Sequence, residues 1–176
     1  MKILVVYYSR TGYTRIVAKQ IAQSLHADLL ELKEQTNRRG IRGFIKGGYD
    51  ALRHNSTKLM PLEKKSSAYD LVITGSPVWA GTLCPAMRTF LQKNAPFIKQ
   101  VAFFCTHGGG GASKSYADVK TLIGKHPVAT MALRDKAVRC DNMSPAIDDF
   151  LRALSNYSVV GRGVATNSRF KKGKQE

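Results

Sequence analysis

The chain is poor in cysteine and has no long apolar segment. Its 176 residues include three cysteines, Cys84, Cys105 and Cys140, and none of them stands in a CxxC spacing. This excludes a disulfide scaffold, argues against a zinc site and indicates a reducing compartment, so we assign no metal ligands. No apolar run reaches the roughly 18 residues of a membrane span, and residues 3–8 are typical of a strand rather than of a secretory leader. We therefore expect a cytoplasmic protein.

Acidic residues are also scarce. Twelve Asp and Glu stand against 28 Lys and Arg, which gives a formal net charge of +16 and an isoelectric point near 10.0. Residues 34–66 hold eight Lys or Arg against three Asp or Glu, and the last twenty residues hold five against Glu176 alone. Such an excess attracts nucleic acid, anionic lipid or acidic proteins, and it carries no information about the fold.

Apolar segments of strand type alternate with segments of helical periodicity, and this alternation predicts an α/β fold. The strand segments are rich in β-branched and aromatic residues, as parallel strands buried on both faces are. Strands are predicted at 3–8, 28–33, 70–74, 101–105 and 128–133, and helices at about 16–26, 85–93, 113–123 and 145–154. Five strands alternating with helices imply a parallel sheet with helices on both faces. From about Gly161 the composition predicts disorder.

Ligands of such sheets bind at the carboxyl ends of the strands. After the first strand the chain reads Ser9-Arg10-Thr11-Gly12-Tyr13-Thr14, which places three hydroxyls and a run of backbone N–H groups at the start of a helix. This combination suits a phosphate, because a helix N-terminus carries a partial positive charge. The spacing matches neither a nucleoside triphosphate loop nor a dinucleotide loop, so it favours a monophosphate. A simple Ser/Thr helix cap is the alternative interpretation.

Two further loops fall at the same edge of the predicted sheet. Residues 75–85 contain the single tryptophan, Trp79, which could lie against a planar heterocycle or only cover the edge of the core. Residues 106–113 contain four consecutive glycines, which let the backbone approach a ligand closely or form a flexible loop. His107 in this loop is a candidate for proton transfer, and a hydrogen-bonding role is the alternative.

The segments 8–14, 69–82 and 104–109 together resemble the flavodoxin-like family, and the resemblance covers about residues 1–156. It implies a doubly wound five-stranded parallel sheet of order 2-1-3-4-5 with FMN at the point where the strand order reverses. FAD is disfavoured, because no adenosine-binding fingerprint is present. The resemblance assigns Ser9, Arg10, Thr11, Gly12, Tyr13 and Thr14 to the FMN phosphate, Pro77, Val78, Trp79, Ala80 and Gly81 to one face of the isoalloxazine, and Thr106, His107, Gly108, Gly109, Gly110 and Gly111 to its other side.

Three features depart from the family's electron carriers. Those carriers are acidic and many present a stacking tyrosine in the third loop, whereas this chain is basic and has glycines and His107 there. The segment 34–66 is also longer than a short crossover and includes an apolar and basic periodicity over 41–53. This periodicity predicts an amphipathic helix whose apolar side packs on the sheet or faces a membrane or partner. Residues 157–176 are predicted to be a basic tail.

These observations predict an FMN-binding oxidoreductase that passes electrons from a reduced donor to a quinone, a flavin or a protein. His107 is the candidate catalytic residue, and FMN carries the redox chemistry. A passive electron carrier is the alternative within this class, and a basic nucleic-acid-binding module on the same scaffold is the alternative outside it. The charge favours an acidic redox protein or an anionic membrane surface as partner, with a peripheral membrane location in the second case. No RNA-binding signature is present, so nucleic acid is disfavoured.

Overall fold

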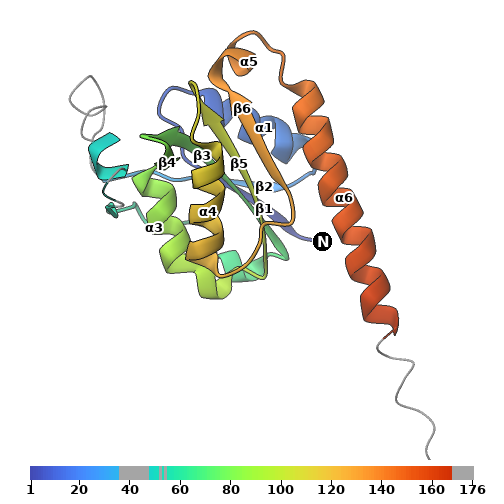
Figure 1. Cartoon of the computed structure of the whole chain (residues 1–176). Helices are drawn as coiled ribbons and strands as arrows, with labels where there is room; N and C mark the ends of the chain where they lie inside the picture. Colours follow the sequence, from blue (N-terminus) through green and yellow to red (C-terminus); the bar gives the residue numbers. More distant parts are fainter. Residues whose placement is uncertain (36–47, 52, 54, 168–176) are drawn as a thin grey trace, which may run out of the picture.

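A parallel β-sheet forms the centre of the protein (Figure 1). The computed structural model describes residues 1–35, 48–51, 53 and 55–167, with the side chains of 158–167 excepted. The strands follow the order β2-β1-β3-β5-β6, which confirms the order 2-1-3-4-5 expected from the resemblance once the short strand β4 is set aside. The bounds are β1 Ile3–Tyr7, β2 Asp28–Glu31, β3 Leu71–Trp79, β4 Thr82–Leu83, β5 Gln100–His107 and β6 Thr130–Arg134.

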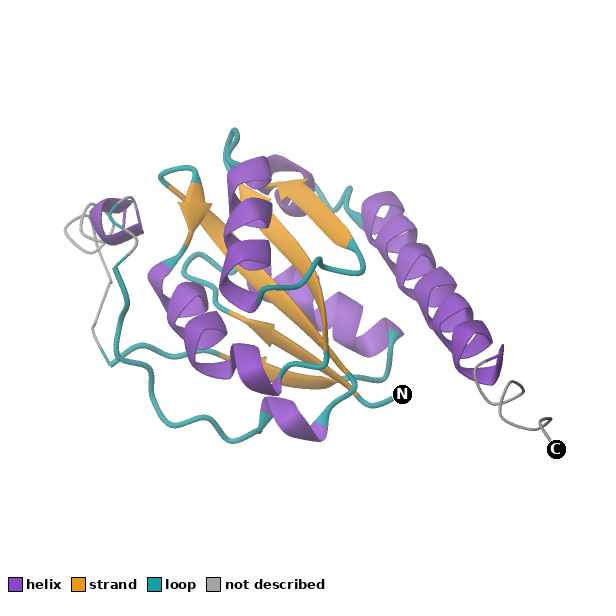
Figure 2. Cartoon of the chain, turned by 60° about the horizontal axis from the view of Figure 1, so that its bottom comes forward, coloured by secondary structure: helices purple, strands orange, loops and turns teal. Residues whose placement is uncertain are grey.

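Helices cover both faces of this sheet, as Figures 1 and 2 show. One face carries α3 and α4, and the other carries α1, α5 and α6. Two short 3-10 helices, η1 and η2, also lie in the described part of the chain. The bounds are α1 Tyr13–Ser24, η1 Ser66–Ala68, α3 Pro85–Asn94, η2 Ala95–Phe97, α4 Ala112–Ile123, α5 Asp135–Arg139 and α6 Ser144–Asn167.

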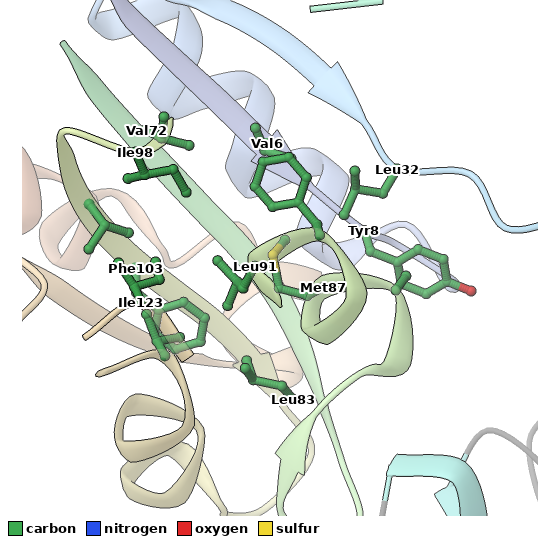
Figure 3. Packing of buried hydrophobic residues seen from close by; sticks show 14 of the residues in the cluster. Val6, Tyr8, Leu32, Val72, Leu83, Met87, Leu91, Ile98, Phe103 and Ile123 are labelled. Carbon is green, nitrogen blue, oxygen red and sulfur yellow. The ribbon is translucent and has the colours of Figure 1, made fainter. Parts of the chain in front are cut away.

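The first strand explains why both faces must be covered. Successive side chains of a strand point to opposite faces, and in β1 Leu4 and Val6 enter the cluster beneath α3 and α4, while Val5 and Tyr7 enter the cluster beneath α1 and α6. All four residues are buried. Figure 3 shows the first of these clusters, in which side chains of the sheet meet those of α3 and α4. An uninterrupted apolar run is therefore required in this strand.

Four elements differ from the sequence-based expectations. Strand β3 runs on to Trp79 and turns back into β4, where a loop was expected. The five-residue helix α5 was not expected at all. Helix α6 continues to Asn167, past the Gly161 at which disorder was expected. Its first turns are anchored by buried Ile147, Phe150 and Leu154, and adding residues to a nucleated helix costs less than starting one.

The long link between β2 and β3 is described only in part. Residues 36–47, 52 and 54 lie outside the described residues, and with them most of the predicted amphipathic helix, of which 48–51 are helical. Further along, residues 58–60 run antiparallel beside 33–35, with the Met60 N–H donating to the Lys33 carbonyl at 2.8 Å. None of the described helices is long and apolar enough to cross a membrane.

Candidate functional site

The three loops singled out in the sequence lie at the same edge of the sheet and contact one another. The hydroxyls of Thr14, in the first turn of α1, and Thr106, near the end of β5, share a buried hydrogen bond of 2.9 Å. Gly111 packs against the tip of the β3–β4 hairpin so closely that a Cβ added there would lie 2.5 Å from the Gly81 Cα. The first and third loops, and the second and third, are thus held together.

Within the described residues, no side chain caps the N-terminus of α1. Gly12 is the N-cap residue, has φ of +100° and receives no side-chain cap hydrogen bond, and the first turn of α1 contains no acidic residue. The Gly12 N–H instead donates to Ser9 Oγ at 3.2 Å, which leaves the Ser9 hydroxyl hydrogen to donate elsewhere. Thr11 is exposed. Uncapped N–H groups and two hydroxyls are the donors that an anion requires at a helix N-terminus.

Thr14 is placed differently from the other two hydroxyl residues of this loop. It is 2% exposed, and its hydroxyl is engaged with Thr106. It can donate to a phosphate only while Thr106 supplies the hydrogen of their shared bond. Arg10 and Tyr13, which were also assigned to the phosphate, are half-buried at the same N-terminal end of α1.

The second loop is a β-hairpin. Val78 pairs with Leu83 and Trp79 pairs with Thr82, so only Ala80 and Gly81 form the turn. Both turn residues have positive φ, +46° and +78°, as a type I′ turn requires. Gly81 adopts this conformation without strain, whereas Ala80 pays a steric cost of about 1 kcal/mol. The expectation of a plain loop over Pro77 to Gly81 was therefore wrong, because the strand continues and reverses.

Trp79 is the last residue of β3 in the hairpin, and it contacts Tyr8, which directly follows β1. Its ring meets that of Tyr8 edge-on, with centroids 5.7 Å apart and an interplanar angle of 85°. The Tyr8 hydroxyl in turn donates to Glu34 at 2.9 Å. Trp79 is half-buried, so part of its surface remains available to a planar ligand.

The third loop combines an open backbone with an imidazole. His107 ends β5, and its Nδ1 is buried with no hydrogen-bond partner among the described residues. Gly108, Gly109 and Gly110 are exposed. Buried polar atoms are seldom left unpaired in a native protein, so the unpaired Nδ1 is consistent with a ligand contact in this loop.

Sequence reasoning missed Asp135, which starts α5 beside this loop. A Cβ added at Gly108 would lie 4.0 Å from the Asp135 Oδ2. Burial raises the pKa of Asp135 above its ordinary value, and the nearby His107 offsets part of this rise. The two residues are 28 positions apart, and nothing in their local patterns links them. Arg88 on α3 and Asp118 on α4, which pair with each other and with the Thr82 hydroxyl of the hairpin, were missed for the same reason.

The arrangement fits the FMN that the resemblance implies. An uncapped helix N-terminus suits its phosphate, and a hairpin with a half-buried indole and a glycine loop with an unpaired imidazole nitrogen suit its ring. Among the described residues, no group of three or more His, Cys, Asp or Glu side chains is arranged to hold a metal ion. A groove of about 330 Å³ lies elsewhere, between β2 and residues 60–63, and includes no residue of the three loops.

Comparisons with known proteins agree with this assignment. A flavoprotein from Lactobacillus acidophilus, solved in complex with FMN, matches with a TM-score of 0.63, 22% identity and coverage of 81% of this chain and 98% of its own. A protein from Bacteroides eggerthii, described as a candidate flavoprotein, matches with a TM-score of 0.61, 21% identity and coverage of 82% and 97%. Flavodoxin 1 from Bacillus cereus matches with a TM-score of 0.53, 13% identity and coverage of 88% of this chain and 98% of its own. These likenesses establish the fold.

Sequence comparison identifies the family. No curated protein matches the chain significantly. The family model described as NADPH-dependent FMN reductase matches residues 1–138, which include all three loops and Asp135. The chain is therefore a flavodoxin-like flavoprotein with FMN as its cofactor, and it belongs to the NADPH-dependent FMN reductase family.

Proposed function

We propose that the protein is an FMN-dependent oxidoreductase that takes electrons from NADPH or NADH and delivers them to a quinone, a flavin or a protein. The observation that carries the proposal is the buried Nδ1 of His107, which has no hydrogen-bond partner in the described part of the chain and lies beside the exposed glycines 108–110. A simple electron carrier needs no proton donor of this kind, whereas reduction of a small organic acceptor consumes protons. The description of the matched family supports a nicotinamide donor.

Each loop has a distinct part in this proposal. The hydroxyls of Ser9 and Thr11 and the uncapped N–H groups of α1 hold the phosphate. The hairpin places Trp79 along one face of the ring, and the glycine loop runs along its other side. When bound, FMN supplies the two-electron redox chemistry.

His107 is proposed to hold the proton that the acceptor takes up, and Asp135 to stabilise its charged form. Burial favours the neutral carboxyl of Asp135, while the nearby imidazole favours its charged form. Replacing His107 with Asn keeps a hydrogen-bonding side chain but removes the imidazole that would transfer the proton. We expect H107N to lower the rate of acceptor reduction, while FMN still binds.

The decisive experiment is anaerobic mixing of the purified FMN protein with NADPH or NADH. Loss of the visible flavin absorbance without any partner protein supports a reductase. Flavin that stays oxidised with either nucleotide, but is reduced by a separate reductase, would instead establish a carrier.

The placement of the ring is tested separately through Trp79. As the only tryptophan, it reports directly on the hairpin. We expect FMN to quench its emission strongly. Unchanged emission, in a sample where flavin binding is seen independently, would move the ring away from the hairpin.

The charge supports a further proposal about the partner. A net charge of +16 favours an acidic redox protein or an anionic membrane surface. Either association should weaken steeply with salt, because exposed charges are screened over about 8 Å at physiological ionic strength. Flotation with anionic vesicles and binding to an acidic ferredoxin, each at low and high salt, distinguish the two partners. The alternative of a nucleic-acid-binding module finds no support in the comparisons.

A further inference from the structure

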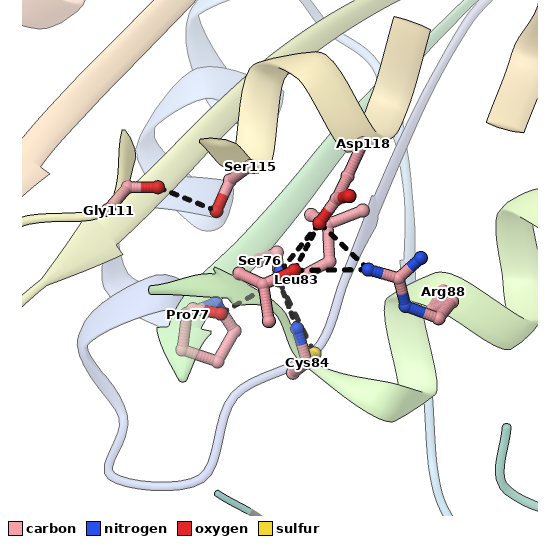
Figure 4. A network of polar contacts seen from close by, with 9 residues as sticks. Ser76, Pro77, Leu83, Cys84, Arg88, Gly111, Ser115 and Asp118 are labelled. Carbon is pink, nitrogen blue, oxygen red and sulfur yellow. Dashed lines mark hydrogen bonds and ion pairs between the residues drawn. The ribbon is translucent and has the colours of Figure 1, made fainter. Parts of the chain in front are cut away.

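A largely buried ion pair joins the hairpin to α3 and α4. Arg88 on α3 donates through Nη2 to the Asp118 Oδ2 on α4 at 2.8 Å, and these side chains are only 6% and 15% exposed. The same Arg88 nitrogen donates to Thr82 Oγ1 at 3.0 Å. The Thr82 hydroxyl and the Leu83 N–H both donate to the Asp118 Oδ2, the latter at 3.4 Å. One carboxylate oxygen therefore joins α3, α4 and the hairpin (Figure 4).

Stability alone does not account for this pair. Removing two charges from water is costly, and a buried ion pair is often no more stabilising than apolar side chains of the same shape. Arg88 adds to this cost, because its Nε is buried without a hydrogen-bond partner among the described residues. The pair instead fixes the position of Thr82 relative to α3 and α4, which apolar contacts would not do.

The braced elements are those that carry the second and third loops. Strand β4 is half of the hairpin that holds Trp79, and α4 begins at Ala112, directly after the glycine loop. At the start of α4, the Ser115 hydroxyl donates to the Gly111 carbonyl at 3.1 Å. Gly111 itself packs on Gly81 at the hairpin tip. The hairpin and the glycine loop are thus joined at the tip by the two glycines and at the base by Asp118.

The first loop is held by other contacts. Its hydrogen bonds to Ser9 and Thr106 involve neither member of the ion pair. Neither Arg88 nor Asp118 therefore takes part in the contacts that hold the phosphate end of the site, which is joined to the third loop through the Thr14–Thr106 hydrogen bond.

We propose that Arg88 and Asp118 are positioning residues that hold the hairpin and the glycine loop as one preformed unit, and so determine the affinity for the isoalloxazine ring independently of the phosphate. This inference rests on the placement of the ring under Proposed function. Neither residue needs to touch the flavin. A preformed site binds more tightly because less ordering remains to be done on binding.

The test is the double variant R88M/D118L, which replaces both charges with apolar side chains of similar shape and leaves no unpaired charge. The matched control is R152M/D149L, which removes an exposed ion pair of the same residue types on α6. Thermal unfolding establishes that both variants are folded. Dissociation constants for FMN and for riboflavin, and the Trp79 quenching at saturating FMN, are then measured.

We expect R88M/D118L to weaken FMN and riboflavin by the same factor, about tenfold, with less complete Trp79 quenching. The control should match the wild type in every measurement. A folded double variant with unchanged affinities and quenching would overturn the proposal. So would weaker binding of FMN alone, because that would locate the effect at the phosphate.

A second variant, T82V, covers the case in which the double variant does not fold. It keeps the ion pair and removes only the hydroxyl that joins the hairpin to it. We expect T82V to weaken the binding of FMN and of riboflavin by the same factor, which is smaller than the factor for the double variant. Affinities equal to those of the wild type would overturn the proposal here too. If FMN fails to quench Trp79 in the wild type, the ring placement is at fault, and that result is separate from any effect of the variants.

Discussion

Gly75 lies beneath the aromatic ring of Phe104, and adding one methyl group there should destabilise the whole sheet. The two residues pair across β3 and β5. A Cβ at Gly75 would lie 2.5 Å from the Phe104 Cε1 and 2.8 Å from its Cε2, and closer still to Cζ. Phe104 is fully buried in the cluster beneath α1 and α6, so its ring cannot swing into solvent. The substitution G75A therefore forces the two strands or their neighbours to shift.

The size of the effect follows from this packing. Inserting a methyl group into a filled core costs about 1 to 3 kcal/mol, and overlap with several ring atoms places G75A near the upper value. For a chain of this length each kcal/mol lowers the melting temperature by about 2 to 4 °C. We expect a fall of about 6 to 12 °C, measured by circular dichroism on the FMN-free protein.

Two further variants check the reasoning behind this value. Gly48 is helical and has nothing within 4 Å of an added Cβ, so G48A should leave the melting temperature unchanged or raise it slightly. The double variant G75A/F104L should be less destabilised than the sum of its single variants, because leucine vacates the space that the methyl group needs. A melting temperature of G75A within about 2 °C of the wild type would refute the reasoning.

Three further predictions concern groups with defined surroundings. Burial raises the pKa of Cys84 to about 11 and that of Cys105 to about 12, so in the native protein at neutral pH only exposed Cys140 should react with a thiol reagent, and a second fast-reacting thiol would contradict this. The Tyr69 hydroxyl and Lys64 lower the pKa of Asp28 below its ordinary 3.8, so the stability it adds is present above about pH 4 and is lost as pH falls through the lowered value. D28N should therefore have a lower melting temperature than the wild type at neutral pH, and this difference should vanish in acid; a difference that does not change with pH would count against these contacts of Asp28 with Tyr69 and Lys64. Riboflavin should bind at least about a hundredfold more weakly than FMN, because two charge-assisted hydrogen bonds to the phosphate are worth about 3 kcal/mol or more. Equal affinities for the two flavins would show that the first loop does not hold the phosphate and is only a helix cap.

Local patterns were sufficient for the main strands of the sheet and for the edge at which the three loops meet. The apolar run of β1 must be buried on both faces, so its sequence alone indicates a parallel strand. The glycine and hydroxyl residues that follow the strands can also be recognised in the sequence alone, and they mark the loops at this edge. Strand order and the cofactor came from the family resemblance, since neither follows from periodicity.

The missed elements share the property that no local pattern encodes them. The hairpin turn has Ala80 where Asn or Asp would signal a type I′ turn, and β4 is only two residues long. Helix α5 has five residues, too few to show a period. Arg88 and Asp118 are 30 positions apart, so only the packing of α3 against α4 reveals the pair.

The strand pairing also has a consequence for how the chain folds. Each parallel pair in the sheet joins residues far apart in the chain, from 24 positions for Leu4 and Asp28 to 68 for Ile3 and Leu71. Such pairs form only after a long crossover has collapsed, and contacts of this kind slow folding. Among the described strand pairs, β3 and β4 alone close through two residues. The hairpin that carries Trp79 can therefore form on the microsecond scale of isolated hairpins, before the sheet to which it belongs is complete.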